Sequence, residues 1–356
     1  MKLLEKLGPF KAALGKKKAL LGVEIGTNAI KIADIKRKGS QLVLHQAHVV
    51  PLPPGKMSMG SIEDQEGLAS ELDTIWNTLN LKNRNISLAL PGNLTILRRT
   101  RLPYVPSEEI EKAIQWEIEK TLPFKLEEIH FDFHVYDIKE GENIDLVYVV
   151  ARRNVIESYQ QLFLMAGINL EVLDSTFLAL ANIAIVNYDD LSNVLFMVLD
   201  IGAESSNLLV IKDNRILYSR NVEIGGDVVT QSISRRLDCS IEDAERIKLS
   251  GDIDEDTLRE GSHALASKLH NEIIISLNYS QNLLGTQEGI EKILITGGAS
   301  NTPFLTPELT SFLNVHVQTL SPIRKIDLHP RLDPTHMDEI STRIPIAMGT
   351  ALRSVH

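Results

Sequence analysis

Two short segments that lie far apart in the chain share one pattern: an apolar strand that ends in an acid, one further residue and a glycine. They read Leu21-Gly22-Val23-Glu24-Ile25-Gly26-Thr27-Asn28 and Met197-Val198-Leu199-Asp200-Ile201-Gly202-Ala203-Glu204-Ser205-Ser206. A second apolar strand follows each turn, over 29–35 and 207–211. The carboxylate at such a turn can hold a hydrated Mg²⁺, the glycine lets backbone N–H groups approach a phosphate, and the hydroxyl can donate to it. Two such turns acting together would hold a polyphosphate from both sides.

Length and composition exclude several classes of protein. The chain has 356 residues and a net charge of −10. The length favours two or more domains, and the acidic balance argues against a general nucleic-acid binder. Cys239 is the single cysteine, which excludes an internal disulfide and a thiolate metal site and fits a reducing cytosol. No apolar stretch approaches the length that spans a bilayer.

The first eighteen residues form a basic segment. Lysines at positions 2, 6, 11, 16, 17 and 18 stand against the single acid Glu5, and Leu3, Leu4, Leu7, Phe10 and Leu14 fall at roughly helical spacing. The segment lacks the apolar core and the cleavage site of a signal peptide. A solvated basic tail is the favoured interpretation, and a weak contact with anionic lipid is the alternative; the two can coexist.

The periodicity of apolar residues predicts an alternation of strands and helices. Strands or hairpins are expected at 20–35, 42–50, 85–90, 95–102, 129–138, 144–151, 170–173, 195–211, 216–222 and 292–296, and helices at 66–79, 107–122, 154–166, 176–186, 227–237, 240–250, 261–284 and 344–352. Ser107 is expected to cap its helix, and the polar segment 327–343 to be a loop. The helix, two strands and helix within 103–168 are too small to be the main core and indicate an inserted subdomain. The repeated hairpin indicates two related halves.

Two further segments strengthen the prediction of a nucleotide site. The apolar strand 293–296 runs into Gly297-Gly298-Ala299, where glycine permits close approach of the backbone to a flat ligand such as adenine; the alternative is a plain helix-entry turn. Glu245 and Lys248 are three residues apart on one helix face, where they could bind ribose hydroxyls and a phosphate. Taken alone, this second pair is better interpreted as an ordinary surface ion pair.

In this order and spacing the four segments resemble the superfamily of actin, Hsp70 and the sugar kinases, over residues 20–352. The resemblance implies an α/β, actin-like (ribonuclease H-like) fold with two lobes, duplicated mixed sheets and ATP and Mg²⁺ as ligands. The implied nucleotide-binding residues are Gly26, Thr27, Asn28, Lys31, Gly202, Ala203, Glu204, Ser205, Ser206, Gly225, Gly226, Glu245, Lys248, Gly297, Gly298 and Ala299. Glu24 and Asp200 are the implied metal residues, acting through water, and Asp200 and Asp174 the implied catalytic acids.

Within the superfamily the chain resembles the PilM family, the cytoplasmic actin-like proteins of type IV pilus assembly. Residues 111–128 (EKAIQWEIEKTLPFKLEE) resemble the inserted subdomain of that family, and 347–353 resemble its closing helix. The second hairpin, 200–206, lacks the extra glycines of chaperone-type members. The small subdomain after Leu102 also matches the position of the extra domain in PilM and the division protein FtsA, which actin and Hsp70 lack there.

The resemblance implies a division of the chain and a partner. It predicts a basic tail (1–18), a first lobe (19–102, 169–193 and 343–356) with an inserted α+β subdomain (103–168), and a second lobe (194–228 and 291–342) with a subdomain at 229–290. The implied partner is the short cytoplasmic N-terminal peptide of the membrane protein PilN, in a groove between the first lobe and the inserted subdomain. Arg98, Arg99, Arg101, Leu102 and Trp116 lie in that region; a solvated strand edge and a core tryptophan are the alternative interpretation.

The departures from the superfamily pattern favour nucleotide binding over fast hydrolysis. Glu24 replaces the usual aspartate of the first hairpin, and Ala203 and Glu204 replace glycines of the second. Because hydrolysis depends on close placement of water and metal, we expect at most weak ATPase activity.

The most favoured function is therefore an ATP-binding scaffold of the pilus inner-membrane platform, cytoplasmic and held at the membrane through its partners, whose nucleotide state is signalled by closure of the two lobes. Self-association is compatible with the sequence. An FtsA-like filament-forming protein is the second hypothesis; its usual membrane helix after a linker is not seen before His356. A small-molecule kinase of the same superfamily is the third, and no aspartate with a distinct substrate pocket supports it.

Overall fold

The computed structural model describes residues 20–284 and 288–354, and side chains over the same residues except 282–284. The basic segment 1–18 therefore lies outside the described residues. The chain divides into two units. Unit 1 comprises Met1–Ile183, Ile326–Leu332 and Ile346–His356, and unit 2 comprises Ala184–Lys325 and Asp333–Pro345. The expected boundary of the second lobe differs here, because Ile326–Leu332 joins unit 1 rather than the lobe that was to contain 291–342.

Unit 1 is built on a six-stranded mixed sheet in the order β10-β6-β1-β2-β3-β16. The strands are β1 (Leu21–Ile25), β2 (Ala29–Lys38), β3 (Gln41–Pro51), β6 (Asn85–Leu90), β10 (Asn169–Ser175) and β16 (Ile326–Leu328), with a two-stranded ribbon of β4 (Met57–Ser58) and β5 (Ser61–Ile62). The first three strands are antiparallel, while β6 and β10 run parallel to β1, and β16 runs parallel to β3. The expected loop at 327–343 is wrong, because β16 and the helix α9 (Pro334–Ile340) both fall there.

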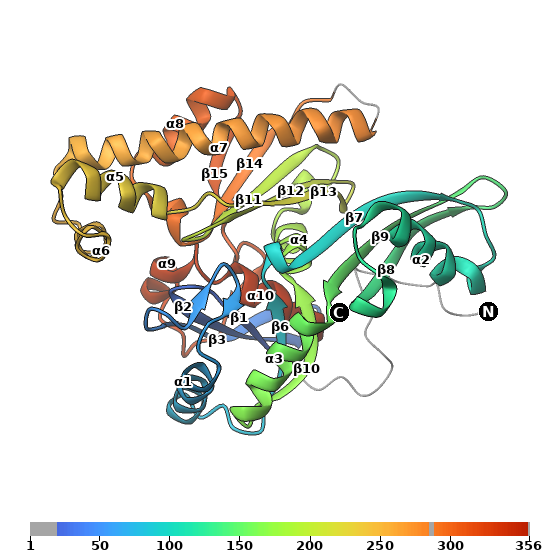
Figure 1. The fold of residues 1–356 in the computed structure, drawn as a ribbon, viewed down its shortest axis with the longest axis horizontal. Coiled ribbons are helices and arrows are strands. Elements are labelled where there is room, and N and C mark those ends of the chain that lie inside the picture. Colours follow the sequence, from blue (N-terminus) through green and yellow to red (C-terminus); the bar gives the residue numbers. More distant parts are fainter. Residues whose placement is uncertain (1–19, 285–287, 355–356) are drawn as a thin grey trace. The chain divides into compact units, whose positions relative to one another are not determined.

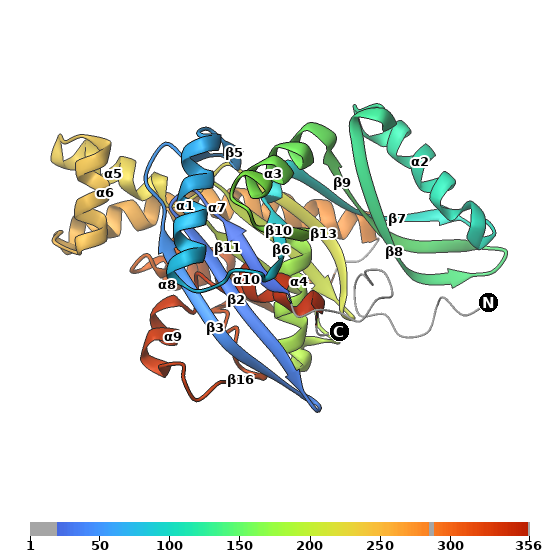
Figure 2. The ribbon, with the colours of Figure 1, turned by 90° about the horizontal axis from the view of Figure 1, so that it is seen from below.

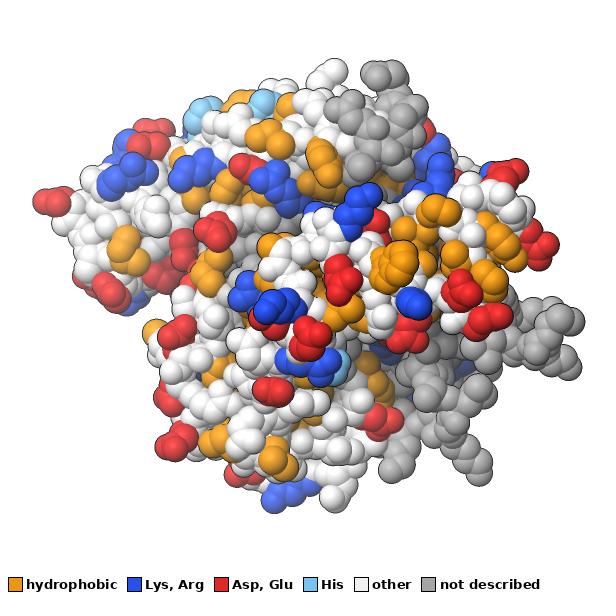
Figure 3. Space-filling model, turned by 45° about the vertical axis from the view of Figure 1, so that its right-hand side comes forward, with side chains coloured by type: hydrophobic (Ala, Val, Ile, Leu, Met, Phe, Trp, Pro, Cys, Tyr) orange, Lys and Arg blue, Asp and Glu red, His pale blue; other side chains and the backbone are white. Residues whose placement is uncertain are grey.

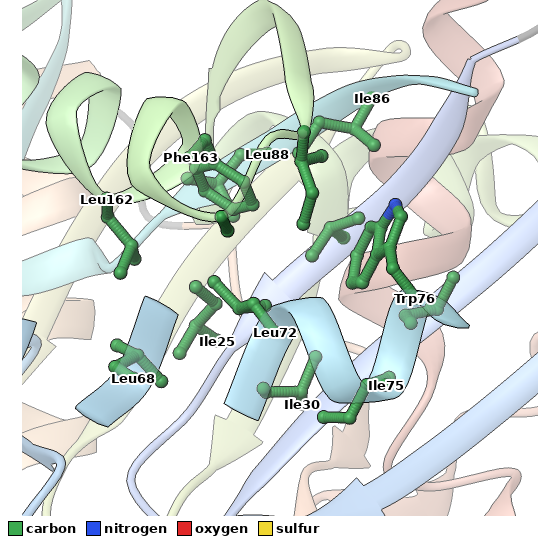
Figure 4. Close-up of a cluster of buried hydrophobic side chains, with 14 of the residues drawn as sticks. Ile25, Ile30, Leu68, Leu72, Ile75, Trp76, Ile86, Leu88, Leu162 and Phe163 are labelled. Atoms are coloured by element: carbon green, nitrogen blue, oxygen red, sulfur yellow. The ribbon is translucent and has the colours of Figure 1, made fainter. Parts of the chain in front are cut away.

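One face of this sheet is covered by α1 (Gln65–Thr78) and α3 (Arg153–Met165) (Figures 1 and 2). Strand residues at alternate positions turn apolar side chains toward the two helices, as period-two alternation requires. Figure 4 shows this cluster, in which Ile25, Ile30, Ile86 and Leu88 of the strands meet Leu68, Leu72, Ile75, Trp76, Leu162 and Phe163 of the helices.

The opposite face of the sheet packs against α10 (Pro345–Ala351), and α10 packs in turn against α4 (Thr176–Asn187). Both contacts depend on glycine. A Cβ atom added at Gly22 would lie 1.9 Å from the carbonyl oxygen of Ala347, and one added at Gly349 would lie 1.9 Å from that of Ala179. Backbone therefore meets backbone on both sides of α10.

A second, three-stranded sheet in unit 1 has the order β7-β9-β8, with β7 (Thr95–Pro103), β8 (Ile129–Lys139) and β9 (Asn143–Arg152). The helix α2 (Ile110–Thr121) covers one face, and Ile114, Ile118, Leu146 and Tyr148 lie in the core between them. The expected limits 103–168 differ from this arrangement at both ends. β7 pairs with β9 along its length, and the side chains of α3 lie in the core of the six-stranded sheet, so the three-stranded unit spans 95–152.

The start of α2 also differs from the expectation. Ser107 does not cap it; residues Ser107–Glu109 form a 3₁₀ turn, and no side chain accepts a hydrogen bond from the first turn of the helix. Pro106 precedes this turn, and its carbonyl accepts the hydrogen bond from Glu109 N–H at 2.9 Å that closes it. The cap was predicted from residue type alone, whereas in the structure Ser107 begins the 3₁₀ turn that precedes the helix.

Unit 2 contains a five-stranded mixed sheet in the order β13-β12-β11-β14-β15. The strands are β11 (Phe196–Ile201), β12 (Ser206–Lys212), β13 (Arg215–Val222), β14 (Lys292–Thr296) and β15 (His316–Thr319), and the helices are α5 (Asp227–Leu237), α6 (Ile241–Ser250), α7 (Glu255–Leu284) and α8 (Leu305–Leu313). The apolar sides of α5, α7 and α8 share one core with the sheet. The helix expected at 261–284 is longer and begins at Glu255.

Candidate functional site

The first of the two repeated turns joins β1 to β2 in unit 1. Glu24 and Lys31 are paired in register across these strands, and their side chains form an ion pair of 2.6 Å in which each is 14% exposed. The N–H of Gly26 donates to the carbonyl of Ala29 at 2.9 Å. A Cβ atom at Gly26 would lie 2.5 Å from Lys31 Nζ, so the glycine makes room for the lysine over the turn.

The second turn joins β11 to β12 in unit 2, and it is closed by a hydrogen bond of 3.0 Å from Gly202 N–H to the carbonyl of Ser205. Asp200 stands opposite Asn207 in the register of the two strands, and Asn207 Nδ2 donates to Asp200 Oδ2 at 2.8 Å. Both side chains are buried. The acid that the sequence predicted as a metal residue is therefore fixed by an amide on the following strand.

The Gly225-Gly226 turn packs directly on this second hairpin. Gly226 N–H donates to the carbonyl of Gly202 and Asp227 N–H to that of Ala203, each at 2.9 Å. A Cβ atom at Gly225 would lie 2.3 Å from the carbonyl oxygen of Ala203, so a side chain there would displace the turn. The start of α5 is thereby attached to residues 202–203.

Lys248 and Glu245 on α6 reach the same place. Lys248 Nζ lies 2.5 Å from Glu245 Oε2 and donates to Thr230 Oγ1 at 2.7 Å. The position of a Cβ atom at Gly226 is 3.9 Å from Lys248 Nζ and 3.0 Å from Ala299 Cβ. The pair is only partly exposed and lies beside the glycine turn, which argues against the simple surface ion pair.

The last predicted segment, the turn after β14, completes the cluster in unit 2. Gly297 has φ +88°, which favours glycine, and a Cβ atom there would lie 2.3 Å from the carbonyl oxygen of Ile201. Its neighbour Gly298 has no other atom within 4 Å of its Cβ position, so the backbone there borders open space. Of the predicted site residues, those from Asp200 to Ala299 thus gather at one edge of the sheet of unit 2, while residues 24–31 lie in unit 1.

Asp174 has a different environment from the one the resemblance implied. Its two carboxylate oxygens accept hydrogen bonds from Arg353 Nε at 2.7 Å and Arg353 Nη2 at 2.8 Å, and its Oδ1 also accepts from the N–H of Ser175 at 2.8 Å. The side chain of Asp174 is fully buried and that of Arg353 is 8% exposed. This carboxylate therefore holds α10 and the residues after it to β10, and a role in orienting water stays a prediction.

The five residues predicted to line a peptide groove differ in their surroundings, and the groove stays a prediction. Leu102 is buried in the core between the three-stranded sheet and α2. Arg99 is paired with Asp145 and reaches the ring of Tyr136. Trp116 is not a core residue, because it is 68% exposed on α2; Arg98 and Arg101 are exposed on β7. Figure 3 shows hydrophobic side chains interspersed with acidic ones on the face that it presents.

Sequence reasoning missed Asn207, Asn221 and Thr230, whose side chains contact the predicted site residues. Asn207 directly follows the second motif, so its place opposite Asp200 in a hairpin could have been counted from the turn. Asn221 and Thr230 carry no such signal. They reach the site through strand pairing and helix packing, which are set by tertiary structure.

Asp227, the first residue of α5, has a carboxyl group with a shifted pKa. Partial burial raises the pKa of Asp227 above its ordinary value; Lys248 opposes this shift, and Glu245 and Glu204 add to it. Asp227, Glu245 and Glu204 therefore place three carboxylates near one lysine in this cluster. A polyphosphate at this place would need a cation, or protonation, to offset their repulsion.

We expect the Asp227→Asn variant to gain stability relative to the wild type as pH rises from 4 to 7. Because the folded-state pKa of Asp227 is raised, its contribution to stability is complete below the unfolded pKa and is lost as pH rises through the folded value. Urea unfolding of both proteins at each pH measures the difference. Asp256→Asn is the matched control, since Asp256 also lies in the first turn of a helix but is exposed. An equal pH dependence for both variants would contradict the assignment.

Among the described residues, no group of three or more histidine, cysteine, aspartate or glutamate side chains could hold a metal ion by itself. Glu24 Oε2 is buried and has no hydrogen-bond partner. A Mg²⁺ ion commonly takes one or two carboxylates together with waters and phosphate oxygens. The residues present fit a Mg²⁺ site of that kind, and among the described residues they do not form a metal site made of protein ligands alone. Within the described part of the chain, no helix is both long and apolar enough to cross a membrane.

Residues 22–355 match the profile of the family described as type IV pilus assembly protein PilM. The chain belongs to the PilM family. The same family was expected from the resemblance of residues 111–128, 200–206 and 347–353, and that expectation is confirmed.

Solved structures agree with this assignment. The PilM family member resembles a chain of a PilM-PilN type IV pilus biogenesis complex with a TM-score of 0.84 and 27% identity, over 96% of this chain and 99% of that one. The ethanolamine utilization protein EutJ from Carboxydothermus hydrogenoformans follows at 0.54 and 16%, over 92% and 89% of the two chains. MreB5 of Spiroplasma citri bound to AMPPNP gives 0.50 and 13%, over 85% and 92%. These likenesses confirm the α/β, actin-like fold.

A curated relative matches over a short segment. The type II secretion system protein L of Xanthomonas campestris pv. campestris is 29% identical over 68 residues, which cover 19% of this chain and 18% of that protein. The match spans less than a fifth of either chain.

Proposed function

We propose that this PilM family member is a Mg-ATP-binding scaffold of the type IV pilus inner-membrane platform. The observation that carries the proposal is the cluster in unit 2. There the Gly225-Gly226 turn packs on the carbonyls of residues 202–203, the Gly297 turn packs on that of Ile201, and open space lies beside Gly298. Lys248 supplies a cation beside Gly226. Glycine turns, a hydroxyl at Ser205 and one lysine are the groups that bind phosphate oxygens.

Mg²⁺ fits the acids at the two repeated turns. Asp200 and Glu24 would hold the ion through water, and the ion would offset the charge of the triphosphate. The orphaned, buried Oε2 of Glu24 supports this role, because a buried carboxylate oxygen without a partner is costly unless a ligand satisfies it.

We further propose that residues of both units contact one nucleotide and that its binding changes their arrangement. Gly26, Thr27, Asn28 and Lys31 are the candidates in unit 1. Lys31 donates to Glu24 Oε1, and on nucleotide binding it would exchange that carboxylate for a phosphate. A ligand shifts such an equilibrium only by its different affinity for the two arrangements. Hydrolysis is proposed to be weak at most, because Ala203 and Glu204 depart from the glycines expected in the second hairpin of the superfamily.

The proposed partner is the cytoplasmic N-terminal peptide of a PilN-type membrane protein. Support comes from membership of the PilM family and from the 27% identity to a chain of a PilM-PilN complex over 96% of this chain. Binding to such a protein would hold the chain at the cytoplasmic side of the inner membrane.

Two titrations test these proposals. A synthetic PilN N-terminal peptide labelled with a fluorophore is titrated with the protein, with and without Mg-ATP, and anisotropy is recorded; a peptide of scrambled sequence is the control. Calorimetry with ATP is run in parallel, with Mg²⁺ and with EDTA. We expect specific peptide binding whose affinity depends on Mg-ATP. Equal affinities for the native and scrambled peptides would reject the partner, and no heat with Mg-ATP would reject the nucleotide site.

A further inference from the structure

Three polar side chains stand directly opposite one another on three neighbouring strands of unit 2. In the strand register Asp200 of β11 faces Asn207 of β12, and Asn207 faces Asn221 of β13. Residues that are opposite in register turn their side chains to the same face of the sheet. The row therefore begins at the predicted metal residue and ends on a strand that lies outside both parts of the hairpin motif.

Hydrogen bonds run along this row in one direction. Asn207 Nδ2 donates to Asp200 Oδ2 at 2.8 Å, and Asn221 Nδ2 donates to Asn207 Oδ1 at 2.9 Å. An ionised carboxylate only accepts, so Asp200 determines which way the amide of Asn207 faces. Asn207 must then present its oxygen to the next strand, and only a donor satisfies it there. Asn221 is that donor.

Asn221 also reaches the phosphate turn. Its Nδ2 group has two hydrogens, and the second is donated to Ser205 Oγ at 3.2 Å. Because the Ser205 oxygen accepts at this contact, its own hydroxyl proton is available for donation to an anion. One amide therefore fixes both the acid that would hold the metal and the hydroxyl that would hold the phosphate.

We propose that Asn221 is a positioning residue for nucleotide binding: it orients Asp200 through Asn207 and directs the Ser205 hydroxyl toward the phosphate. The inference rests on the proposed function and adds a residue that neither repeated motif contains. The amide side chains of Asn207 and Asn221 are uncharged, so the row holds Asp200 without adding a second ionisable group beside it.

The Asn221→Asp variant tests this role with almost no change in size. The introduced carboxylate cannot donate to Asn207, and it accepts the Ser205 proton that would otherwise reach a phosphate. We expect the affinity for Mg-ATP, measured by calorimetry at pH 7.5, to fall about tenfold, the effect of one or two lost hydrogen bonds. Asn278→Asp is the matched control, because the same replacement on the exposed side of α7 should leave the affinity unchanged.

A pH profile separates positioning from a structural defect. As pH falls from 7.5 to 4.5, about a fifth of an aspartic acid with the ordinary pKa becomes protonated and can donate again, so the affinity deficit of Asn221→Asp should shrink. The ratio of its dissociation constant to that of Asn278→Asp is compared at both pH values. A misfolded site would give a deficit that does not change with pH.

A second variant tests the contact between Asp200 and Asn207 by its effect on stability, without nucleotide. Asn207→Asp places a carboxylate opposite Asp200, and two close carboxylates raise the pKa of one of them. The variant should therefore lose stability relative to the wild type as pH rises from 4 to 7, and Mg²⁺ alone should restore part of it at pH 7. Urea unfolding measures both effects.

The outcomes distinguish the inference from the proposed function. If the wild type binds Mg-ATP and Asn221→Asp binds it equally well, the positioning role is wrong and the nucleotide site stands. If the wild type does not bind Mg-ATP, the nucleotide site is rejected. In that case the Asn207→Asp variant still tests the contact between residues 200 and 207. If its free energy of unfolding equals that of the wild type at every pH, these two residues are not in contact in solution.

Discussion

Replacing Asp200 by alanine is expected to weaken Mg-ATP binding by about 100-fold or more, or ~2.7 kcal/mol. The change removes the carboxylate proposed to hold the metal through water. It also leaves Asn207 Nδ2, now bonded to Asp200 at 2.8 Å, without its acceptor in a buried place. Both effects act on the part of the turn where the phosphates are proposed to bind.

Calorimetry with Mg-ATP measures the loss, and the shift of the thermal midpoint by Mg-ATP gives a second readout of the same affinity. Asp252→Ala is the control, since Asp252 is an exposed acid of the same unit. The lost contact of Asn207 should also lower stability without nucleotide by about 1–3 kcal/mol. Circular dichroism must therefore show a folded Asp200→Ala protein before its affinity is judged. A folded variant with wild-type affinity would refute the metal role of Asp200.

Replacing Arg353 by alanine is expected to cost about 3–5 kcal/mol of unfolding free energy. The guanidinium donates twice to Asp174, whose side chain is fully buried. Removing one partner of such a pair leaves a charge in the interior, which costs far more than the pair contributes. Urea unfolding with a spectroscopic readout gives the value directly.

The exposed pair of Arg246 and Asp243 supplies the control, because Arg246→Ala should leave stability close to that of the wild type. Replacing both Asp174 and Arg353 by apolar residues, as Asp174→Leu with Arg353→Met, should recover most of the loss. A loss for Arg353→Ala as small as that for Arg246→Ala would show that the buried pair is not formed. A rate of ATP hydrolysis equal to that of the wild type in the double variant would remove Asp174 from the list of catalytic acids.

The sequence predicted the fold through patterns that local chemistry controls. Apolar strands, the two acid-x-Gly turns and the glycine pairs each depend on a few neighbouring residues, so the two hairpins and the Gly297 turn were found at their correct places. The way in which these hairpins and turns combine into one fold came from the family resemblance, because the periodicity of apolar residues does not predict it.

Other features depend on distant partners and were missed. The strand β16 has three residues and exists only because it pairs with β3, more than 250 positions away in the chain. Asn221 reaches the predicted site by strand register, and Asp174 meets Arg353, which lies 179 positions later in the chain. Trp116 was assigned to a core as an alternative, but the periodicity of α2 cannot tell which single aromatic side chain stays outside.

Unit 1 is assembled from three separate stretches of chain, and its final pieces, β16 and α10, are encoded after nearly all of unit 2. While the ribosome is still making unit 2, the surface around Gly22 and the outer edge of β3 have no covering element from their own unit. Synthesis of this protein therefore passes through a stage with an unfinished amino-terminal half, and no single cut in the chain yields both units whole.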